Sequence, residues 1–422
     1  MIGLLDCNNF YASCERAFNP KLEGQPIGIL SNNDGCVIAR SNELKPYVPM
    51  GMPAFKIPPH IKKKITLLSS NYELYGDMSQ RVFSIVQEYI YDTELYSIDE
   101  AFLHLQNKQN ATEYCIALRK IIHQCTGIPV SIGLSLTKTL AKIANHVAKK
   151  NTDYQGVYFL NPDHPAFASI LQQFPVTEIW GIGRRLSVKL SNMGIQTAWQ
   201  LRNCDAHFLG KQFSVVMERT ILELRGIPCI DLEGTHTLKK NIMTSRSFGN
   251  ATNDFHDLED IVRIHASRGA EKLRSQHSLA QAVLVFLKTN RFHKIKSQYH
   301  PSIAIPLLYP TSDTREIIQA AQNGLRRIYK KNYLYQKAGI MMLDIVGQDK
   351  NQLNIFSNTN TDEAKKRSEI LMQTLDNINK KMGRNKIAFG ATKSTASWNL
   401  KRNHLSQRYT TRWDELPVVK AV

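Results

Sequence analysis

Short apolar runs alternate with longer amphipathic stretches through the first 160 residues of this chain. Runs of this kind are typical of buried strands, whereas apolar residues that recur every three or four positions are typical of helices. The pattern predicts strands at 2–5, 27–30, 95–98, 101–105 and 130–135, and helices at 71–89 and 138–150. The proline-rich stretch 20–65, which contains Lys62–Lys64, interrupts the alternation and predicts a loop-rich insertion with a basic rim.

The second half of the chain follows a different order of elements. Asn161-Pro162 and Pro165 mark a boundary, residues 165–230 are mainly helical in pattern, and the polar residues 231–240 predict a tether. Beyond the tether, the pattern predicts strand, helix, strand, strand, helix and strand at 242–248, 258–274, 282–288, 302–308, 314–329 and 338–346. This β-α-β-β-α-β order predicts a ferredoxin-like split sandwich, so the expected fold class is α+β and multidomain.

The charge balance favours a polyanionic partner. The 422 residues include 54 Lys and Arg against 36 Asp and Glu, a net charge of +18, which makes nucleic acid a better partner than an anionic membrane. A chain of this length is expected to form roughly two to four domains. No apolar stretch approaches the length of a membrane span, and the N-terminus lacks the features of a signal peptide. The seven cysteines are scattered without a Cys-x-x-Cys pair, so we expect neither disulfides nor zinc, and a cytoplasmic location.

Basic residues also crowd the loops and strand ends of the predicted split sandwich. An open sheet with such a face could lie along a nucleic-acid backbone, although an ordinary solvated face explains the same residues. The residues are Arg246, Lys288, Arg291, Lys294, Lys296, Arg326 and Arg327.

Three carboxylates stand where the pattern predicts buried strands. Asp6 ends the first apolar run, and Asp99-Glu100 lie between two further runs. Unpaired acids are rare in strand interiors because desolvating a charge is costly, and carboxylates from two strands could together hold a pair of Mg²⁺ ions. The alternative is one helix-capping acid and one solvated turn.

A glycine-rich turn lies in the helical stretch. Gly181-Ile182-Gly183 is followed by Arg184 and Arg185, and two short helices joined by such a turn form a helix-hairpin-helix, whose amides grip DNA phosphates. The sequence has neither a dinucleotide-binding fingerprint nor a P-loop at this point. An ordinary helical hairpin remains the alternative, but the nearby cations favour contact with the DNA backbone.

These residues together resemble a known family. The segment Asp6 to Ala12, the segment Ser97 to Phe102 and the Gly181–Gly183 hairpin resemble the Y-family translesion DNA polymerases. The resemblance spans nearly the whole chain. Further matches lie at 31–40, 69–75, 245–249 and 408–412.

The resemblance implies a right-handed polymerase architecture. The palm would comprise 1–18 and 75–165, the fingers 19–74, and a thumb with the helix-hairpin-helix 166–230. A linker at 231–240 would lead to the little finger at 241–350, and 351–422 would hold a clamp-binding peptide and a partner-docking tail.

The resemblance also implies the catalytic residues. Asp6, Asp99 and Glu100 would hold two Mg²⁺ ions, with the Cys7 carbonyl as a further ligand. Asn8 stands where many relatives carry an acid, so we do not expect a charged ligand there. Tyr11 matches the steric gate, a ring that would collide with a ribose 2′-hydroxyl; the alternative is a core tyrosine.

Contacts with the nucleotide are implied in the same way. Lys149 would neutralise the triphosphate, with Lys142 one helical face away. Asn42 and Lys45 stand where relatives often present a tyrosine and an arginine, so the phosphates would be held more loosely unless Arg40 compensates. The remaining nucleotide-binding candidates are Phe10, Ala12 and Ile38, and the DNA-binding candidates are Gly181, Gly183, Arg184, Arg185, Arg246, Lys288 and Arg291.

A short peptide after the last predicted strand resembles the motif with which polymerases dock on the sliding clamp. It comprises Gln352, Leu353, Ile355 and Phe356, and a packed tail is the alternative. The resemblance further implies a complex with a processed UmuD-type dimer and activation by a RecA filament, through the tail. No feature of the composition shows either partner.

The leading hypothesis is therefore a template-directed, error-prone DNA polymerase for translesion synthesis in the SOS response to DNA damage. Two alternatives are a two-metal DNA nuclease and a DNA-damage binding subunit without activity. Phe10-Tyr11-Ala12 argues against the nuclease, since a nuclease has no need to exclude a ribose. The three intact acids argue against the inactive subunit.

Overall fold

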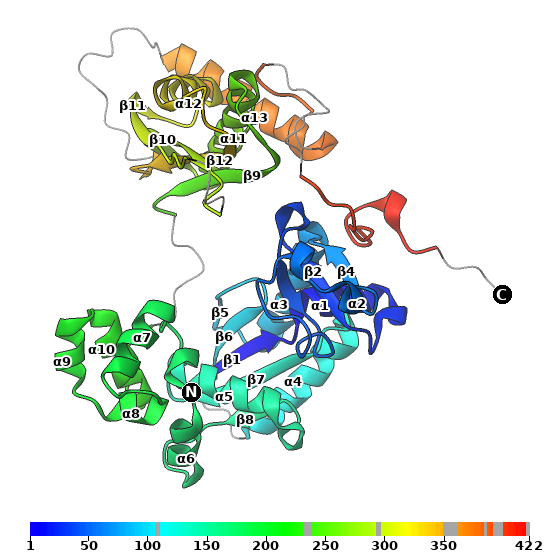
Figure 1. Ribbon diagram of the computed structural model, residues 1–422, viewed down its shortest axis with the longest axis vertical. Helices are drawn as coiled ribbons and strands as arrows, with labels where there is room; N and C mark the ends of the chain where they lie inside the picture. The colour runs from blue at the N-terminus through cyan, green and yellow to red at the C-terminus, as the bar shows by residue number, and fades with distance from the viewer. Residues whose placement is uncertain are drawn as a thin grey trace. The chain divides into compact units, whose positions relative to one another are not determined.

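The computed structural model describes residues 1–105, 110–231, 239–292, 297–348, 362–383, 386–390 and 400–418 (Figure 1). The chain divides into two compact units. The first comprises Met1–His236 with Arg402–Val422, and the second comprises Thr237–Lys401. Among the described residues, no helix is both long enough and apolar enough to cross a membrane.

A five-stranded sheet forms the centre of the first unit, in the order β5-β6-β1-β7-β8. Strand β1 is antiparallel to both β6 and β7, and β8 is parallel to β7. The strands are β1 (Ile2–Cys7), β5 (Thr93–Leu95), β6 (Glu100–His104), β7 (Val130–Ser135) and β8 (Val157–Phe159). Because successive side chains point to opposite faces of a strand, Leu5 and Cys7 share one face of β1, and Leu4 and Asp6 share the other.

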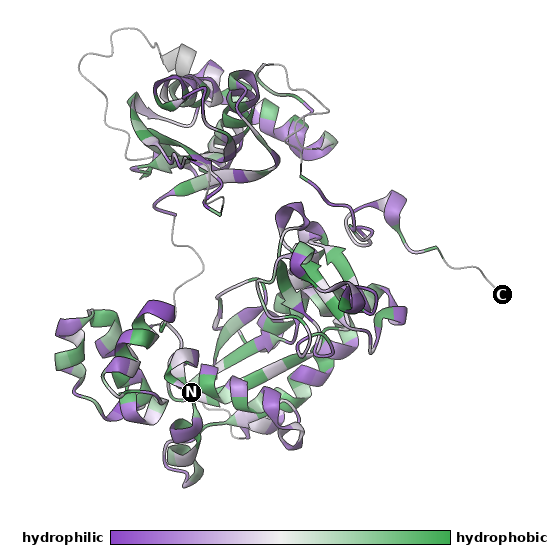
Figure 2. Ribbon diagram, in the orientation of Figure 1, coloured by the Kyte–Doolittle hydropathy of each residue, from purple (hydrophilic) through white to green (hydrophobic). Residues whose placement is uncertain are grey.

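Helices cover both faces of this sheet. The face with Leu5 and Cys7 packs against α1 (Phe10–Phe18), α3 (Tyr72–Tyr89) and α4 (Ala111–Thr126) in one apolar core. The face with Leu4 packs against α5 (Lys138–Lys150). Gly133 in β7 permits this close approach, since a Cβ at this position would lie 2.1 Å from the backbone nitrogen of Asn145. Hydrophobic residues accordingly follow the strands in Figure 2.

The proline-rich insertion forms a small sheet in the order β3-β2-β4. Its elements are η1 (Pro20–Leu22), β2 (Ile27–Leu30), η2 (Asn32–Asp34), β3 (Val37–Arg40), η3 (Ala54–Lys56), α2 (Pro59–Lys62) and β4 (Thr66–Ser69). Leu30, Val37 and Leu44 belong to its separate apolar core. The insertion therefore folds as a lobe with short elements, as the prolines predict.

Short helices lie between residues 152 and 224, on either side of β8 along the chain. They are η4 (Thr152–Tyr154), α6 (Ala166–Gln173), η5 (Val176–Glu178), α7 (Arg184–Asn192), α8 (Ala198–Asn203), α9 (Ala206–Gln212) and α10 (Val215–Leu224). Their core includes Leu140, Ile143 and Ala144 of α5, so this helix is shared between the sheet and the helical lobe. The short helix before the Gly181–Gly183 turn is the 3-10 helix η5, and the helix after the turn is α7.

The second unit has the predicted β-α-β-β-α-β order. Its elements are β9 (Ile242–Thr252), α11 (Phe255–Ser275), β10 (Ser278–Thr289), β11 (Ser302–Thr311), α12 (Thr314–Ile328) and β12 (Tyr335–Leu343), followed by β13 (Val346–Gly347) and α13 (Asp362–Met382). The sheet order is β11-β10-β12-β9, so the second and fourth strands are central. In a ferredoxin the first and third strands are central. Both split β-α-β units of the prediction are present, but the strand order differs.

One predicted strand is wrong. The apolar run 95–98 predicts a strand, but β5 ends at Leu95 and the next residues form a bend before β6. The Ser97 hydroxyl accepts hydrogen bonds from the Asp99 and Glu100 amides, at 3.1 and 3.0 Å. These bonds replace strand pairing, and Ser is a residue that favours such local turns. The other predicted strands and helices of the first unit are confirmed within a few residues.

Candidate active site

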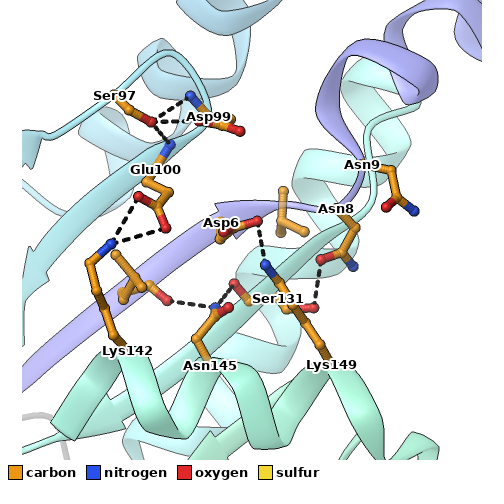
Figure 3. A network of polar contacts seen from close by, with 12 residues as sticks. Asp6, Asn8, Asn9, Ser97, Asp99, Glu100, Ser131, Lys142, Asn145 and Lys149 are labelled. Carbon is orange, nitrogen blue, oxygen red and sulfur yellow. Dashed lines mark hydrogen bonds and ion pairs between the residues drawn. The ribbon is translucent and has the colours of Figure 1, made fainter. Parts of the chain in front are cut away.

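Asp6 and Glu100 face each other across two paired strands. They are direct register partners in the antiparallel pair β1–β6, and alternation along each strand points both side chains to the face that α5 covers. Their side chains are only 16% and 20% exposed. Figure 3 shows the two carboxylates directed toward the same helix.

Helix α5 presents three polar residues to this face. Lys142, Asn145 and Lys149 are spaced at i, i+3 and i+7, which places them on one side of a helix. Lys149 Nζ lies 2.6 Å from Asp6 Oδ1, and Lys142 Nζ lies 3.0 Å from Glu100 Oε2. Each carboxylate therefore has its own ammonium partner from the helix (Figure 3).

Asn145 fixes the distance between the helix and the sheet. Its Nδ2 donates to the Leu4 carbonyl at 3.2 Å and to the Ser131 carbonyl at 2.8 Å, so one amide joins α5 to both β1 and β7. Close to these two hydrogen bonds, the Asn8 side chain accepts a hydrogen bond from Ser131 Oγ at 3.0 Å. Sequence analysis did not select Asn145, although its spacing between the two lysines was the available signal.

Burial disfavours the charged form of the Asp6 carboxylate. The pKa of Asp6 is raised to about 6, mainly by burial; Lys149 opposes the rise, and the neighbouring Glu100 and Asp99 add to it. The ammonium of Lys149 therefore compensates the carboxylates only in part. A site of this kind favours an additional cation.

Asp99 lies in the bend before β6. Its carboxylate accepts from Ser97 Oγ at 2.5 Å, and its carbonyl accepts from the Cys7 amide at 2.8 Å. Ser97 therefore holds both neighbouring acids in place, by its hydroxyl to Asp99 and by its contact with the Glu100 amide. Sequence analysis included Ser97 in the motif without giving it a role.

The donor set suits a hard divalent cation, because it consists of carboxylates and a backbone carbonyl. In the described ranges, no three His, Cys, Asp or Glu side chains are grouped closely enough to hold a metal ion. The ion pairs to Lys142 and Lys149 and the bond from Ser97 to Asp99 give the physical reason: each acid is paired locally. Asp6 and Glu100 are thus brought together, with Asp99 in the adjoining bend, and the three do not form a closed group of ligands in the described part of the chain.

An aromatic group surrounds Lys142. Its Nζ lies 4.6 Å from the ring centroid of Tyr96, 5.3 Å from that of Trp180 and 5.7 Å from that of Phe102. The indole of Trp180 donates to the Tyr96 hydroxyl at 3.0 Å. A cleft of about 200 Å³ lies beside this group and is lined by Asp6, Glu100, Lys142, Lys149 and Trp180, among others. The aromatic cage was not foreseen from the sequence.

Tyr11 lies at the start of α1 and is half-buried. Its ring stacks on Tyr75, with centroids 4.4 Å apart and planes 15° apart, and meets Tyr72 edge-on at 6.0 Å. The pKa of Tyr11 is raised to about 12, mainly by burial, so the hydroxyl stays protonated. The neighbours Phe10 and Ala12 are buried core residues, so we expect any nucleotide contact of theirs to involve the backbone.

The predicted phosphate-binding residues of the insertion lie near Lys149. Lys45 Nζ donates to Asn42 Oδ1 at 2.7 Å, and the pKa of Lys45 is lowered by burial and by the charges of Lys149 and Arg40. Arg40 donates through Nη1 to the Val48 carbonyl at 2.8 Å, while its Nε is buried without a hydrogen-bond partner among the described residues. Ile38 lies in β3 and is partly exposed. The charges of Lys45, Lys149 and Arg40 therefore lie close enough to influence one another.

The Gly181–Gly183 turn is open to solvent. Gly181 has φ +86°, a conformation that glycine adopts without strain, and Gly183 is the N-cap of α7. Arg184 and Arg185 are exposed at the first turn of that helix. The N–H groups of such a turn suit a phosphate.

The basic candidates of the second unit do not share one face. Arg246 is paired with the buried Ala338, which places it on the face covered by α11, whereas Lys288 is paired with Lys337 on the opposite face. The expected continuous basic face is therefore wrong for Arg246. Arg291 is exposed beside Phe292. Arg326 and Arg327 end α12, while Lys294, Lys296 and the predicted clamp peptide at 352–356 lie outside the described residues.

Comparison with known proteins places this geometry in a family. Residues 5–146 match the impB/mucB/samB family, residues 239–355 match its C-terminal domain, and residues 369–419 match a domain of unknown function. Among solved structures, a Y-family DNA polymerase chimera of Dbh and Dpo4 gives a TM-score of 0.66 at 20% identity, covering 82% of this chain and 100% of that chain. DinB from Sulfolobus solfataricus gives 0.52 at the same identity and coverage.

The chain belongs to the Y family of DNA polymerases, whose fold has a palm, fingers, a thumb and a little finger. Within that class it falls in the UmuC, ImpB, SamB and MucB group. Protein UmuC of Salmonella typhimurium is 42% identical over 427 residues, and Protein ImpB of the same organism is 39% identical over 430; both alignments cover 100% of each chain. DNA polymerase IV 1 of Bacillus subtilis is 26% identical over 399 residues, 92% of each chain. The resemblance drawn from the sequence motifs, to the Y family and within it to UmuC, is confirmed.

Proposed function

We propose that this translesion polymerase extends a DNA primer opposite damaged template bases as part of the SOS response, in the bacterial cytoplasm. The observation that carries the proposal is the pair Asp6–Glu100, opposed across β1 and β6 and faced by Lys149 and Lys142. The related Dbh DNA polymerase has been solved as an insertion ternary complex, which supports DNA and a nucleotide as the substrates here.

In the proposed mechanism, Asp6, Asp99, Glu100 and the Cys7 carbonyl would hold two Mg²⁺ ions. When bound, these ions lower the pKa of the primer 3′-hydroxyl and neutralise the triphosphate and the leaving pyrophosphate. Asp6, with its pKa of about 6, is mostly ionised and ready to bind a cation at neutral pH. Ser97 keeps Asp99 and the start of β6 in position.

The nucleotide is proposed to lie between the palm and the fingers lobe. Lys149, Lys45 and Arg40 supply positive charge for the triphosphate. Lysines give point charges without the bidentate geometry of arginine, so phosphate orientation depends on several weak contacts. Tyr11 is proposed to exclude ribonucleotides by contact with the 2′-hydroxyl.

DNA and partner contacts complete the proposal. The open Gly181–Gly183 turn, with Arg184 and Arg185, suits the DNA backbone, and Lys288 and Arg291 offer further phosphate contacts in the little finger. The peptide at 352–356 is proposed to bind the sliding clamp. A processed UmuD-type dimer and a RecA filament are proposed partners from the likeness to UmuC. The domain boundaries of the sequence analysis stay proposals.

Primer extension on a template with one abasic site tests the proposal. We expect the purified chain with Mg²⁺ and deoxynucleotides to add a nucleotide opposite the site, and the labelled primer to stay intact at its 3′ end. Shortened primer without extension would favour the nuclease instead. Binding to the damaged template with neither reaction, in the presence of the proposed partners, would favour the inactive subunit.

A further inference from the structure

The C-terminal residues 402–418, which lie within the match to a domain of unknown function, fold back on the first unit of the same chain. Their contacts converge on β4, the start of α3 and the inner face of α1. The expected role of this tail is partner docking, and several of its described residues, among them Ser406, Arg408 and Tyr409, also contact the first unit.

The tail joins the strand β4 and the loop after β2 through backbone groups. The Ser69 amide donates to the His404 carbonyl at 2.9 Å, and the His404 amide donates to Ser69 Oγ at 3.1 Å. The Asn403 amide donates to Asp34 Oδ2 at 2.8 Å. These bonds extend one end of the small sheet with a segment more than 300 residues away in sequence.

The same segment holds the first turn of α3. Asn71 caps this helix, because its Oδ1 accepts from the Leu74 amide, and its Nδ2 donates to Ser406 Oγ at 2.9 Å and to the Gln407 carbonyl at 3.1 Å. Asn71 is only 2% exposed, so these hydrogen bonds are buried. The tail therefore hydrogen-bonds to the residue that caps α3.

A buried carboxylate connects the tail to the proposed sugar gate. Glu15 of α1 is 2% exposed, and its Oε1 accepts from Ser406 Oγ at 3.0 Å and from the Tyr75 hydroxyl at 2.7 Å. Tyr75 is fully buried and stacks on Tyr11 at 4.4 Å. The Ser406–Glu15–Tyr75 bonds thus end on the ring that supports Tyr11.

The tail also has an internal ion pair and further contacts with α1 and α3. Arg408 pairs with Glu415 within the tail and approaches Glu73 of α3 at 3.6 Å. The ring of Tyr409 stacks on Phe18 of α1, with centroids 4.9 Å apart. Anchors at both α1 and α3 hold together the two helices that carry Tyr11 and Tyr75.

We propose that residues 403–415 are a built-in brace that positions the sugar gate, and that Ser406, Glu15 and Tyr75 are positioning residues for Tyr11. The proposal rests on the proposed role of Tyr11 as the gate. Loss of the brace frees Tyr75 to shift, which leaves Tyr11 less firmly placed against a ribose 2′-hydroxyl. The tail then determines discrimination between ribonucleotides and deoxyribonucleotides without touching the substrate.

Single-nucleotide insertion by the full-length chain tests the brace, with the ratio of ribonucleotide to deoxyribonucleotide kcat/KM as readout. Ser406→Ala removes one hydroxyl and Tyr75→Phe keeps the stacked ring, so both variants are expected to fold. Each should raise the ratio about five-fold, the equivalent of one ordinary hydrogen bond. Trp413→Ala is the matched control in the same segment, because Trp413 is 90% exposed, and it should leave the ratio unchanged.

Tyr11→Ala separates the brace from the gate itself. If Tyr11→Ala raises the ratio strongly while Ser406→Ala and Tyr75→Phe leave it unchanged, the proposed role of Tyr11 is supported and the brace is refuted. If Tyr11→Ala has no effect on the ratio, the proposed function of Tyr11 fails. A parallel loss of both activities in Ser406→Ala, with a lower unfolding midpoint, would show a merely structural tail and would also overturn the proposal.

Discussion

Replacing Asn145 with alanine should destabilise the palm more than any exposed substitution. The side chain is 3% exposed, and its Nδ2 makes two hydrogen bonds that join α5 to backbone carbonyls of β1 and β7. Each bond contributes about 0.5–1.5 kcal/mol, and buried carbonyls that lose their donor add a desolvation cost, so we expect a loss of about 2–4 kcal/mol. This is a large part of the usual stability of a domain, about 5–15 kcal/mol.

Urea denaturation followed by far-UV circular dichroism measures this loss. Asn192→Ala is the control, because Asn192 is an exposed residue near the end of α7. Lys142 and Lys149 flank Asn145 on α5, so a looser helix should also raise the KM for deoxynucleotides under conditions where the variant is folded. An unfolding midpoint for Asn145→Ala equal to that of Asn192→Ala would refute the proposed stabilising role of the Asn145 hydrogen bonds.

Three further predictions follow from other parts of the chain. Tyr11→Ala should admit ribonucleotides far more readily while keeping deoxynucleotide activity, as measured by single-nucleotide insertion; a parallel fall would make Tyr11 a packing residue. His265 has its pKa lowered to about 4, mainly by burial and then by Arg246 and other cations, so the unfolded state binds more protons between pH 6.5 and 4. The contribution of His265 to the free energy of unfolding of the second unit should therefore be at its maximum above pH 6.5. It should fall by roughly 3 kcal/mol as the pH is lowered toward 4. Hydrogen exchange of α11 should show this fall, and His265→Gln should flatten it. Leu353→Ala with Phe356→Ala should cost about 2–4 kcal/mol of clamp affinity, measured by titration, with single-nucleotide addition unchanged.

Periodicity predicts most elements of this fold because most of its strands and helices have one buried face. The strand around Asp6 and helix α5 were expected within a residue or two, and alternation places Asp6 on the same face as Leu4, which the structure shows to be covered by α5. The run 95–98 misled because Tyr96 and Ile98 are apolar in a bend, where the Ser97 hydroxyl outweighs β propensity. A local hydrogen bond of this kind leaves no periodic signal.

The site was harder to predict beyond its carboxylates. The family motif gave Asp6, Asp99, Glu100 and Tyr11, whereas the role of Asn145 depends on how closely α5 approaches β7 at Gly133. Long-range contacts are invisible to a sequence pattern, and the C-terminal tail shows this most clearly. Ser406 and Glu15 are 391 positions apart in the chain and meet only in the folded protein.

Nucleotide addition by Glu100→Gln tests the central claim most directly, with Glu113→Gln as the matched control on the exposed face of α4. Glu100 is proposed to hold a catalytic metal ion, while DNA affinity rests on phosphate contacts elsewhere. We expect Glu100→Gln, and likewise Asp99→Asn, to abolish primer extension at millimolar Mg²⁺ while primer-template binding and the unfolding midpoint stay close to those of Glu113→Gln. Substantial extension by Glu100→Gln under these conditions would contradict the account.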